Sequence, residues 1–137
     1  MQADSNRITR EQTVLIVSGQ SNADSRGILN LMQGKGYRCV VMASLNDLEN
    51  RSETADYLLL IIDVDSVTVN NRVVRDLKLK YHDIEFLCIS GQSFHPDLQD
   101  AISNHFYACL SKPVDSEELF YWLKCIRENE TATRSLP

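Results

Sequence analysis

The sequence lacks three features: an apolar run long enough to cross a membrane, closely spaced cysteines and a surplus of basic residues. A membrane helix needs roughly 20 consecutive apolar residues, and no stretch of this chain approaches that length, so we expect no membrane-spanning segment. The formal net charge is −5. This balance argues against a nucleic-acid-binding surface, because phosphate binding is driven by clustered Lys and Arg.

The four cysteines, Cys39, Cys88, Cys109 and Cys125, are too widely spaced for a zinc or redox motif. We expect buried thiols, with Cys39, Cys88 and Cys109 in or beside apolar stretches where cysteine behaves as a small hydrophobic residue. Residues 1–12 are polar and have no apolar core, so they do not resemble a signal peptide. We therefore expect a cytoplasmic protein.

Length and composition predict one globular domain. The chain has 137 residues, of which 43% are hydrophobic and 24% are charged, which excludes global disorder. We place the domain at residues 13–128. The tails, 1–12 and 129–137, carry few apolar residues, and we expect both to be flexible.

Apolar segments alternate with amphipathic ones along the chain, which predicts strands alternating with helices. The expected strands are Thr13–Ser18, Arg38–Met42, Tyr57–Ile62, Glu85–Ser90 and Tyr107–Ser111. The expected helices are Asn22–Lys35, Ser44–Arg51, Asn71–Tyr81, Pro96–Asn104 and one that begins at Asp115 or Ser116. Parallel strands need long crossovers, so this order predicts an α/β fold with helices on both faces of a five-stranded parallel sheet. Among the topologies that right-handed crossovers allow, we predict the flavodoxin-like strand order.

Polar residues end three of these strands, at the edge of the sheet where ligands bind in such folds. Asp63 follows a continuous apolar run, Ser90 ends the fourth strand, and Lys112 follows the fifth and precedes Pro113. This pattern resembles the acceptor pocket of response-regulator receiver domains, the CheY-like modules of two-component signalling. The resemblance covers roughly residues 13–128.

The resemblance implies a role for each of these residues. Asp63 would be the phosphoacceptor, and the Ser90 hydroxyl would contact the phosphoryl group. Lys112 would act as a point charge for carboxylate or phosphate. The three side chains are expected to converge, and the peptide bond before Pro113 is expected to be cis.

The magnesium site of the family is incomplete in this sequence. Where receivers carry two acidic residues after the first strand, this chain has Ser18 and Gly19. Magnesium is usually held by one or two carboxylates with water and phosphate, so Asp63 alone should bind it weakly. Asp65 is the candidate second ligand, and the expected site is weak or absent. The alternative is that Asp65 caps a turn with Ser66.

We expect Asp24 to lie too far into the first helix to replace the acidic pair. Receivers commonly place an aromatic ring three residues before the lysine, where this chain has Cys109. Side chains alternate along a strand, so we expect Tyr107 to share a face with Cys109. His82, His95 and His105 show no metal-ligand spacing and receive no role.

The last helix carries three adjacent aromatic residues, Phe120, Tyr121 and Trp122, which cannot all face one core. Receivers meet partners or a second copy through the face made by helix four, strand five and helix five. Tyr121 and Trp122 are therefore the candidate interface residues. The alternative is a surface aromatic residue without a role.

The favoured hypothesis is an atypical receiver domain in a phosphorelay, not an enzyme, that acts through protein contacts with Asp63 as candidate phosphoacceptor. Its expected partners are a histidine kinase or other signalling protein, an effector domain or a second copy. One alternative is a fully competent magnesium-dependent phosphoacceptor. Another is a receiver that has lost its chemistry, in which Asp63 and Lys112 only tie two strand ends together. A flavin-binding electron carrier is disfavoured, because the loop 18–22 offers few backbone donors for a phosphate.

Overall fold

The computed structural model describes residues 13–19, 23–49, 57–93 and 95–135. Strands and helices alternate along this part of the chain. The strands are β1 (Thr13–Val17), β2 (Arg38–Met42), β3 (Leu59–Asp63), β4 (Glu85–Ser90) and β5 (Ala108–Ser111). The helices are α1 (Ala23–Gly34), α2 (Leu45–Glu49), α3 (Asn71–Lys80), α4 (Gln99–Asn104) and α5 (Ser116–Ser135), and a 3₁₀ turn, Pro96–Leu98, leads into α4.

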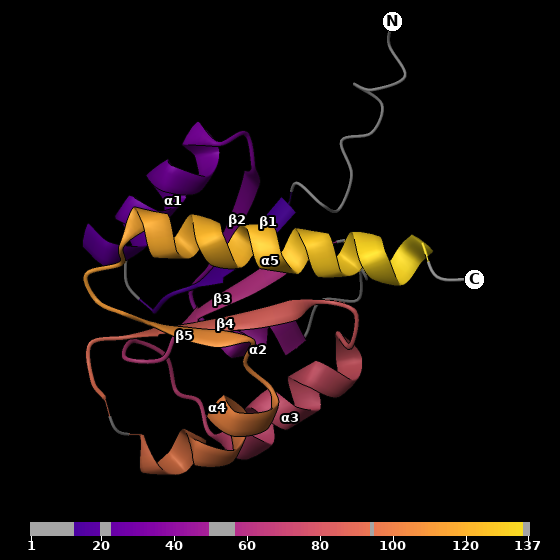
Figure 1. Cartoon of the computed structure of the whole chain (residues 1–137). Coiled ribbons are helices and arrows are strands. Elements are labelled where there is room, and N and C mark those ends of the chain that lie inside the picture. Colours follow the sequence, from indigo (N-terminus) through magenta and orange to yellow (C-terminus); the bar gives the residue numbers. More distant parts are fainter. Residues whose placement is uncertain (1–12, 20–22, 50–56, 94, 136–137) are drawn as a thin grey trace, which may run out of the picture.

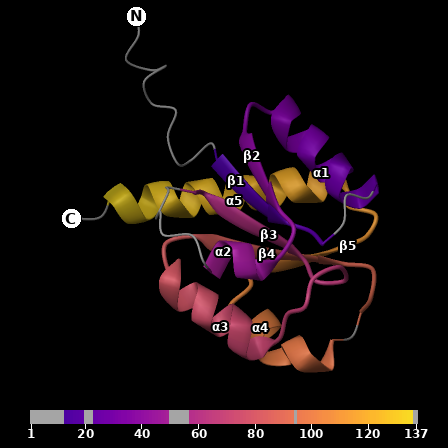
Figure 2. The ribbon, with the colours of Figure 1, turned by 180° about the vertical axis from the view of Figure 1, so that it is seen from behind.

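The strands form one parallel sheet in the order β2-β1-β3-β4-β5, which confirms the predicted flavodoxin-like order. Helices α1 and α5 cover one face of the sheet, and α2, α3 and α4 cover the other (Figures 1 and 2). Each face therefore has its own apolar layer. With both faces covered, the carboxyl ends of the strands remain as the edge at which polar groups collect.

Strand β3 lies at the centre of the sheet, and every one of its residues is buried. A strand with helices on both sides needs apolar residues on both faces, which explains its continuous run of Leu and Ile. Asp63 is the last residue of β3 and is opposite Ile89 on β4. The strand thus begins and ends later than expected, and the Asp63 carboxylate at its end is buried in the core.

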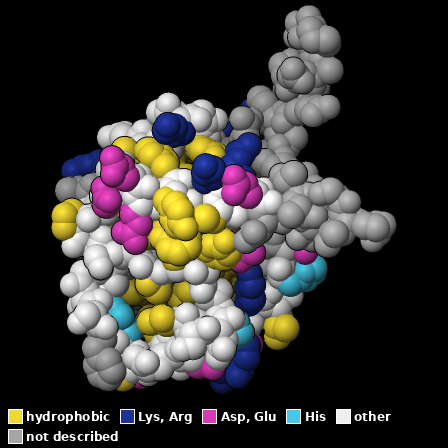
Figure 3. All heavy atoms as spheres, viewed as in Figure 1, with side chains coloured by type: hydrophobic (Ala, Val, Ile, Leu, Met, Phe, Trp, Pro, Cys, Tyr) yellow, Lys and Arg dark blue, Asp and Glu magenta, His cyan; other side chains and the backbone are white. Residues whose placement is uncertain are grey.

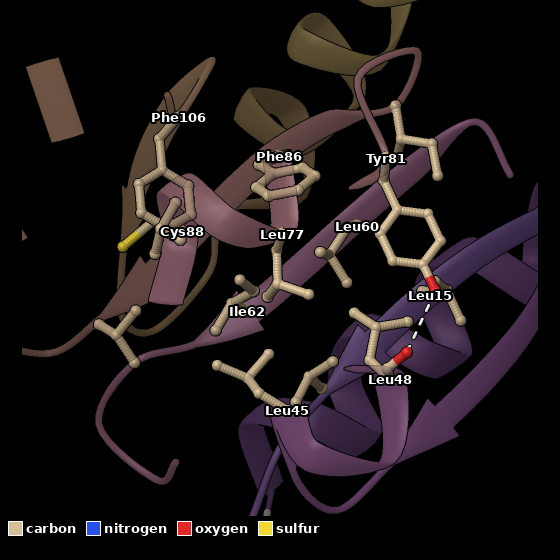
Figure 4. Close-up of a cluster of buried hydrophobic side chains, with 14 of the residues drawn as sticks. Leu15, Leu45, Leu48, Leu60, Ile62, Leu77, Tyr81, Phe86, Cys88 and Phe106 are labelled. Carbon is tan, nitrogen blue, oxygen red and sulfur yellow. Dashed lines mark hydrogen bonds between the residues drawn. The ribbon is translucent and has the colours of Figure 1, made fainter. Parts of the chain in front are cut away.

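The layer under α2 and α3 is built from large side chains of the strands and helices (Figure 4). Phe86 and Leu60 extend from the sheet toward Leu77 of α3. The Tyr81 hydroxyl donates to the Leu48 carbonyl oxygen at 3.1 Å, so the end of α2 is joined to the end of α3. This packing fixes α2 and α3 relative to each other. Helix α3 follows the β3–α3 loop, which carries site residues described below.

Local signals explain where the helices begin and end. The Asn70 side chain accepts from the Val73 backbone N–H at 2.9 Å and so caps the start of α3. Gly36, at φ +91°, turns the chain after α1. Helix α5 continues to Ser135, so residues 129–135, which we predicted as part of a tail, are helical. The predicted tail at 1–12 lies outside the described residues.

No helix among the described residues has both the length and the apolar character needed to cross a membrane.

Candidate functional site

Asp63 and Lys112 form an ion pair at the carboxyl edge of the sheet. The Lys112 ammonium donates to Asp63 Oδ1 at 2.8 Å, and the side chains are 14% and 0% exposed respectively. Asp63 Oδ1 also accepts from the Asp65 backbone N–H at 3.1 Å. The peptide bond between Lys112 and Pro113 is cis, as the sequence resemblance implied.

Asp65 links the β3–α3 loop to the ends of β4 and β5. Its Oδ1 accepts from the Ser90 hydroxyl at 2.9 Å. Its Oδ2 accepts from the Gly91 backbone N–H at 2.6 Å and lies 3.2 Å from the Lys112 ammonium. Asp65 thus links Ser90 to Lys112, and Lys112 contacts Asp63, so the three residues predicted from the sequence lie in one cluster at this edge.

The turn after β3 is closed by Ser66 instead of by the Asp65 carboxylate. The Ser66 backbone N–H donates to the Asp63 carbonyl oxygen at 3.1 Å, and its hydroxyl donates to the same oxygen at 3.3 Å. The Asp65 carboxylate is directed across the sheet edge and does not cap this turn.

The contacts of Asp65 change its acidity. Burial alone would raise its pKa, but hydrogen bonds from Gly91 and Ser90 and the charge of Lys112 outweigh that effect, so the pKa of Asp65 lies below its ordinary value. Burial likewise acts to lower the pKa of Lys112, but the Asp63 and Asp65 carboxylates raise it above its ordinary value. Both groups are therefore charged at neutral pH.

The lowered pKa of Asp65 predicts a dependence of stability on pH. A carboxyl group whose pKa is lower in the folded chain stabilises the fold above its unfolded pKa, and this contribution is lost as pH falls through the folded pKa. We expect Asp65→Asn to reduce the free energy of unfolding by about 1.5 kcal/mol at pH 7, because hydrogen bonds to a charged group are weakened. The difference from wild type should shrink below pH 3.8, the ordinary pKa, in urea titrations at a series of pH values. A difference that stays constant down to pH 2 or so would contradict this assignment.

The residues at the magnesium position of the family do not fit a magnesium ion. The Gly19 backbone N–H donates to Ser66 Oγ at 2.9 Å, and a Cβ on Gly19 would lie 2.0 Å from the Ser66 carbonyl oxygen. No acidic side chain can stand at position 19 without moving the Ser66 backbone. The Lys112 ammonium lies within reach of both Asp63 and Asp65, so the chain itself supplies positive charge beside these carboxylates. Within the described ranges, no three His, Cys, Asp or Glu residues are placed to hold a metal ion.

Asp24 lies closer to the site than the sequence suggested. It is in the first turn of α1, and its Oδ2 is 4.0 Å from the Lys112 ammonium. Asp24 therefore contributes negative charge near Lys112 from the start of α1.

His95 was assigned no role from the sequence, yet its Nε2 lies 2.7 Å from Ser90 Oγ and 3.2 Å from the Gln92 carbonyl oxygen. Ser90 Oγ also accepts from the Gln92 backbone N–H at 2.9 Å. A hydroxyl group has one proton to donate and can accept two hydrogen bonds. With the imidazole proton on Nε2, Ser90 accepts from His95 and Gln92 and donates to Asp65 at 2.9 Å, while the Gln92 carbonyl oxygen lies farther away, 3.2 Å from both Ser90 Oγ and His95 Nε2. No spacing in the sequence signals this contact.

The aromatic residues near the site are arranged differently from our expectation. Tyr107 precedes β5 and packs edge-on against Trp122, with ring centroids 5.8 Å apart, in the layer covered by α5. Cys109 contacts Cys88, which belongs to the opposite layer. The expectation that Tyr107 and Cys109 share a face was therefore wrong, because β5 begins only after Tyr107. Cys88 is buried, but Cys109 is exposed, so the expectation of a buried thiol was also wrong for Cys109.

The two candidate interface residues differ in exposure. Tyr121 is 58% exposed, whereas Trp122 is half-buried against the α5 layer. Their rings contact each other with centroids 5.1 Å apart. Trp122 thus supports the outward-facing Tyr121 ring from beneath.

Comparison with known proteins gave matches in structure only. No protein-family model matches the chain, and no curated protein matches it in sequence. The signal receiver domain of an HD domain-containing protein from Pseudomonas fluorescens Pf-5 is similar, with a TM-score of 0.75 and 18% identity, over 88% of this chain and 97% of that chain. A CheY-like receiver domain protein from Methanospirillum hungatei JF-1 has a TM-score of 0.74 and 15% identity, over 88% and 98% respectively.

A third similar structure is the beryllofluoride-activated NtrC4 receiver domain dimer, with a TM-score of 0.73 and 19% identity, over 86% of this chain and 98% of that chain. Identities this low establish the fold and not the activity. The chain has the fold of CheY-like response-regulator receiver domains.

Proposed function

We propose that this chain is an atypical receiver domain of two-component signalling, which acts through protein contacts, with Asp63 as candidate phosphoacceptor. The observation that carries the proposal is the 2.8 Å contact between the Lys112 ammonium and the buried Asp63 carboxylate at the carboxyl edge of this fold. Ser90 stands at the end of the adjacent strand, joined to both through Asp65. The similarity to receiver structures supports the same reading.

Acceptor chemistry at Asp63 has one favourable and one unfavourable feature. Asp63 Oδ2 is buried and has no hydrogen-bond partner among the described residues, so no hydrogen bond within this part of the chain holds it. Phosphoryl transfer, however, requires dispersed negative charge to be neutralised. The single charge of Lys112 is shared between Asp63 and Asp65, and the residues do not fit magnesium. We therefore expect phosphorylation to be slow or absent and the signal to be carried by contacts.

The contact surface that we propose is the face formed by α4, β5 and α5. Figure 3 shows hydrophobic side chains gathered in the middle of the side of the molecule on which α5 lies. Tyr121 is the exposed large aromatic residue of α5. Aromatic residues of this kind are enriched at binding hot spots. A histidine kinase or other signalling protein, an effector domain or a second copy would meet this face.

The proposal predicts that the site and this face are coupled. Asp63→Asn removes the charge that holds Lys112, and we expect amide NMR shifts in the variant to reach α4 and α5, including Tyr121. As a matched control, Asp76→Asn changes an exposed carboxylate on α3 and should shift only its neighbours. Shifts of Asp63→Asn that remain within the loops of the site would contradict a receiver-type function.

The same spectra test the magnesium-dependent alternative. Magnesium at millimolar concentration followed by beryllofluoride, a phosphoryl mimic, should leave wild-type amide shifts at the site unchanged. Saturable shifts at Asp63, Ser90 and Lys112 that depend on magnesium would instead establish a competent acceptor.

A further inference from the structure

Three hydrogen-bond donors at the ends of two strands converge on one carboxylate. The donors are the Ser90 hydroxyl, the Gly91 backbone N–H and the Lys112 ammonium. We call these three groups together the oxyanion site. They lie 2.9, 2.6 and 3.2 Å from the oxygens of Asp65. A hydroxyl, a backbone amide and a cation aimed at one point are the groups that stabilise an oxyanion in proteins. The fold therefore presents a site for an anion, and a residue of the chain fills it.

Asp65 is well placed to fill the site completely. Its side chain is 21% exposed, and both of its oxygens accept hydrogen bonds within the oxyanion site. Its own backbone N–H donates to Asp63 Oδ1, which fixes the loop at the point where the side chain leaves it. His95 and the Gln92 backbone N–H supply the Ser90 oxygen with donors, which leaves the Ser90 proton directed at Asp65.

The Asp63 carboxylate lies directly beside the oxyanion site. Lys112 bridges the two carboxylates, at 2.8 Å from Asp63 and 3.2 Å from Asp65. Asp63 Oδ2 is fully buried and, within the part of the chain that the structure describes, has no hydrogen-bond partner. A phosphoryl group on the Asp63 carboxylate would compete with Asp65 for the Lys112 ammonium, which bridges the two carboxylates.

We infer that Asp65 is a built-in occupant of the oxyanion site, and that its carboxylate takes the place of a phosphoryl-type anion among Ser90, Gly91 and Lys112. This inference rests on the proposed function, because it identifies how the same site is regulated. Two anions cannot share one set of three donors, so Asp65 excludes tetrahedral oxyanions from the site. The three hydrogen-bond donors are therefore already arranged around an anion, although no phosphoryl group has been transferred to the domain.

The inference predicts that removing the carboxylate opens the site to inorganic phosphate. We expect Asp65→Ala to bind phosphate at least about tenfold more tightly than wild type, because an occupant present in more than about 90% of molecules reduces apparent affinity by that factor. The readout is the chemical shift of the Gly91 and Lys112 amides during a phosphate titration. Asp65→Asn keeps the shape of the side chain without its charge, so its phosphate affinity should lie between those of wild type and Asp65→Ala.

The matched control is Asp24→Ala. Asp24 Oδ2 lies 4.0 Å from the Lys112 ammonium, whereas the hydrogen bonds of Ser90 and Gly91 go to Asp65. This variant removes a nearby negative charge but leaves Asp65 in place, so its phosphate affinity should remain within about twofold of wild type, a change of less than 0.5 kcal/mol or so. An equal gain in Asp24→Ala and Asp65→Ala would mean that only the net charge matters, and the inference would fail.

Two other results would overturn it. Wild type could bind phosphate as tightly as Asp65→Ala, or neither protein could bind it. If Asp65→Ala does not fold, ¹³C NMR titration of the Asp65 carboxyl in wild type replaces the comparison, and a pKa at or above the ordinary value of 3.8 would contradict the contacts. Neither measurement depends on coupling to α4 and α5, so a failure of the proposed function would be seen separately in Asp63→Asn.

Discussion

Replacing Lys112 with methionine is expected to lower the free energy of unfolding by about 3–5 kcal/mol at pH 7, because it leaves an uncompensated charge in the core. Asp63 is 0% exposed, and the Lys112 ammonium is its partner at 2.8 Å. Without that ammonium, the Asp63 and Asp65 carboxylates would face each other with like charge. Methionine keeps most of the apolar stem of lysine, so the loss in free energy of unfolding should come mainly from removal of the positive charge. Urea unfolding at pH 7 measures it.

The double variant Asp63→Asn with Lys112→Met is the control. It removes both charges from the buried pair, and replacing a buried ion pair by neutral groups is often nearly neutral in free energy. We therefore expect the double variant to be more stable than Lys112→Met alone. If the two substitutions acted independently, their losses would add and the double variant would be the less stable one. A loss below about 1 kcal/mol in Lys112→Met would instead be the behaviour of a solvent-screened surface pair.

The fold was predictable because its signals are repeated and strong. The apolar run that ends at Asp63 has both the length and the composition of a strand covered on two faces. Amphipathic segments such as the one that forms α3 separate the strands, so the order of elements limited the topology to few choices. Helix ends were predicted less well, since the end of α5 at Ser135 is not marked by a change in composition.

The positions of Asp63, Ser90 and Lys112 were predictable for a related reason. In a parallel sheet, the carboxyl ends of neighbouring strands lie at one edge, so residues far apart in sequence are brought together by strand order alone. Their geometry follows from the register, in which Asp63 is opposite Ile89 and Ser90 is opposite Ser111. Their roles in signalling remain proposals.

The contacts of Asp65 and His95 were not predictable from the sequence. Both residues lie in loops, whose paths are not set by hydrophobic periodicity. Asp65 reaches Ser90 only because the β3–α3 loop turns through Ser66 and directs its side chain toward β4. His95 returns to Ser90 because the chain after β4 folds back through Gln92. Site residues on strands could be found from pattern, and those on loops required the structure.

Replacing Gly19 with alanine is expected to lower the free energy of unfolding by about 3 kcal/mol, the upper part of the range for overpacked sites. An added Cβ would lie 2.0 Å from the Ser66 carbonyl oxygen, which is backbone and cannot rotate away. The Ser66 loop would have to move, and it carries the contact between Gly19 and Ser66 Oγ. Thermal or urea unfolding measures the loss.

Gly27→Ala provides the matched control, because a Cβ on this α1 glycine meets no described atom within 4 Å beyond its chain neighbours and the backbone of its own helix. It should leave stability unchanged or raise it by up to about 1 kcal/mol, since alanine favours helix more than glycine. Equal stability of Gly19→Ala and wild type would mean that the Ser66 loop moves freely. If the clash holds, Gly19→Asp will be destabilised as well and will not restore a magnesium site. An acidic residue at position 19 and the present path of the Ser66 loop then exclude each other, so no single substitution restores the magnesium site.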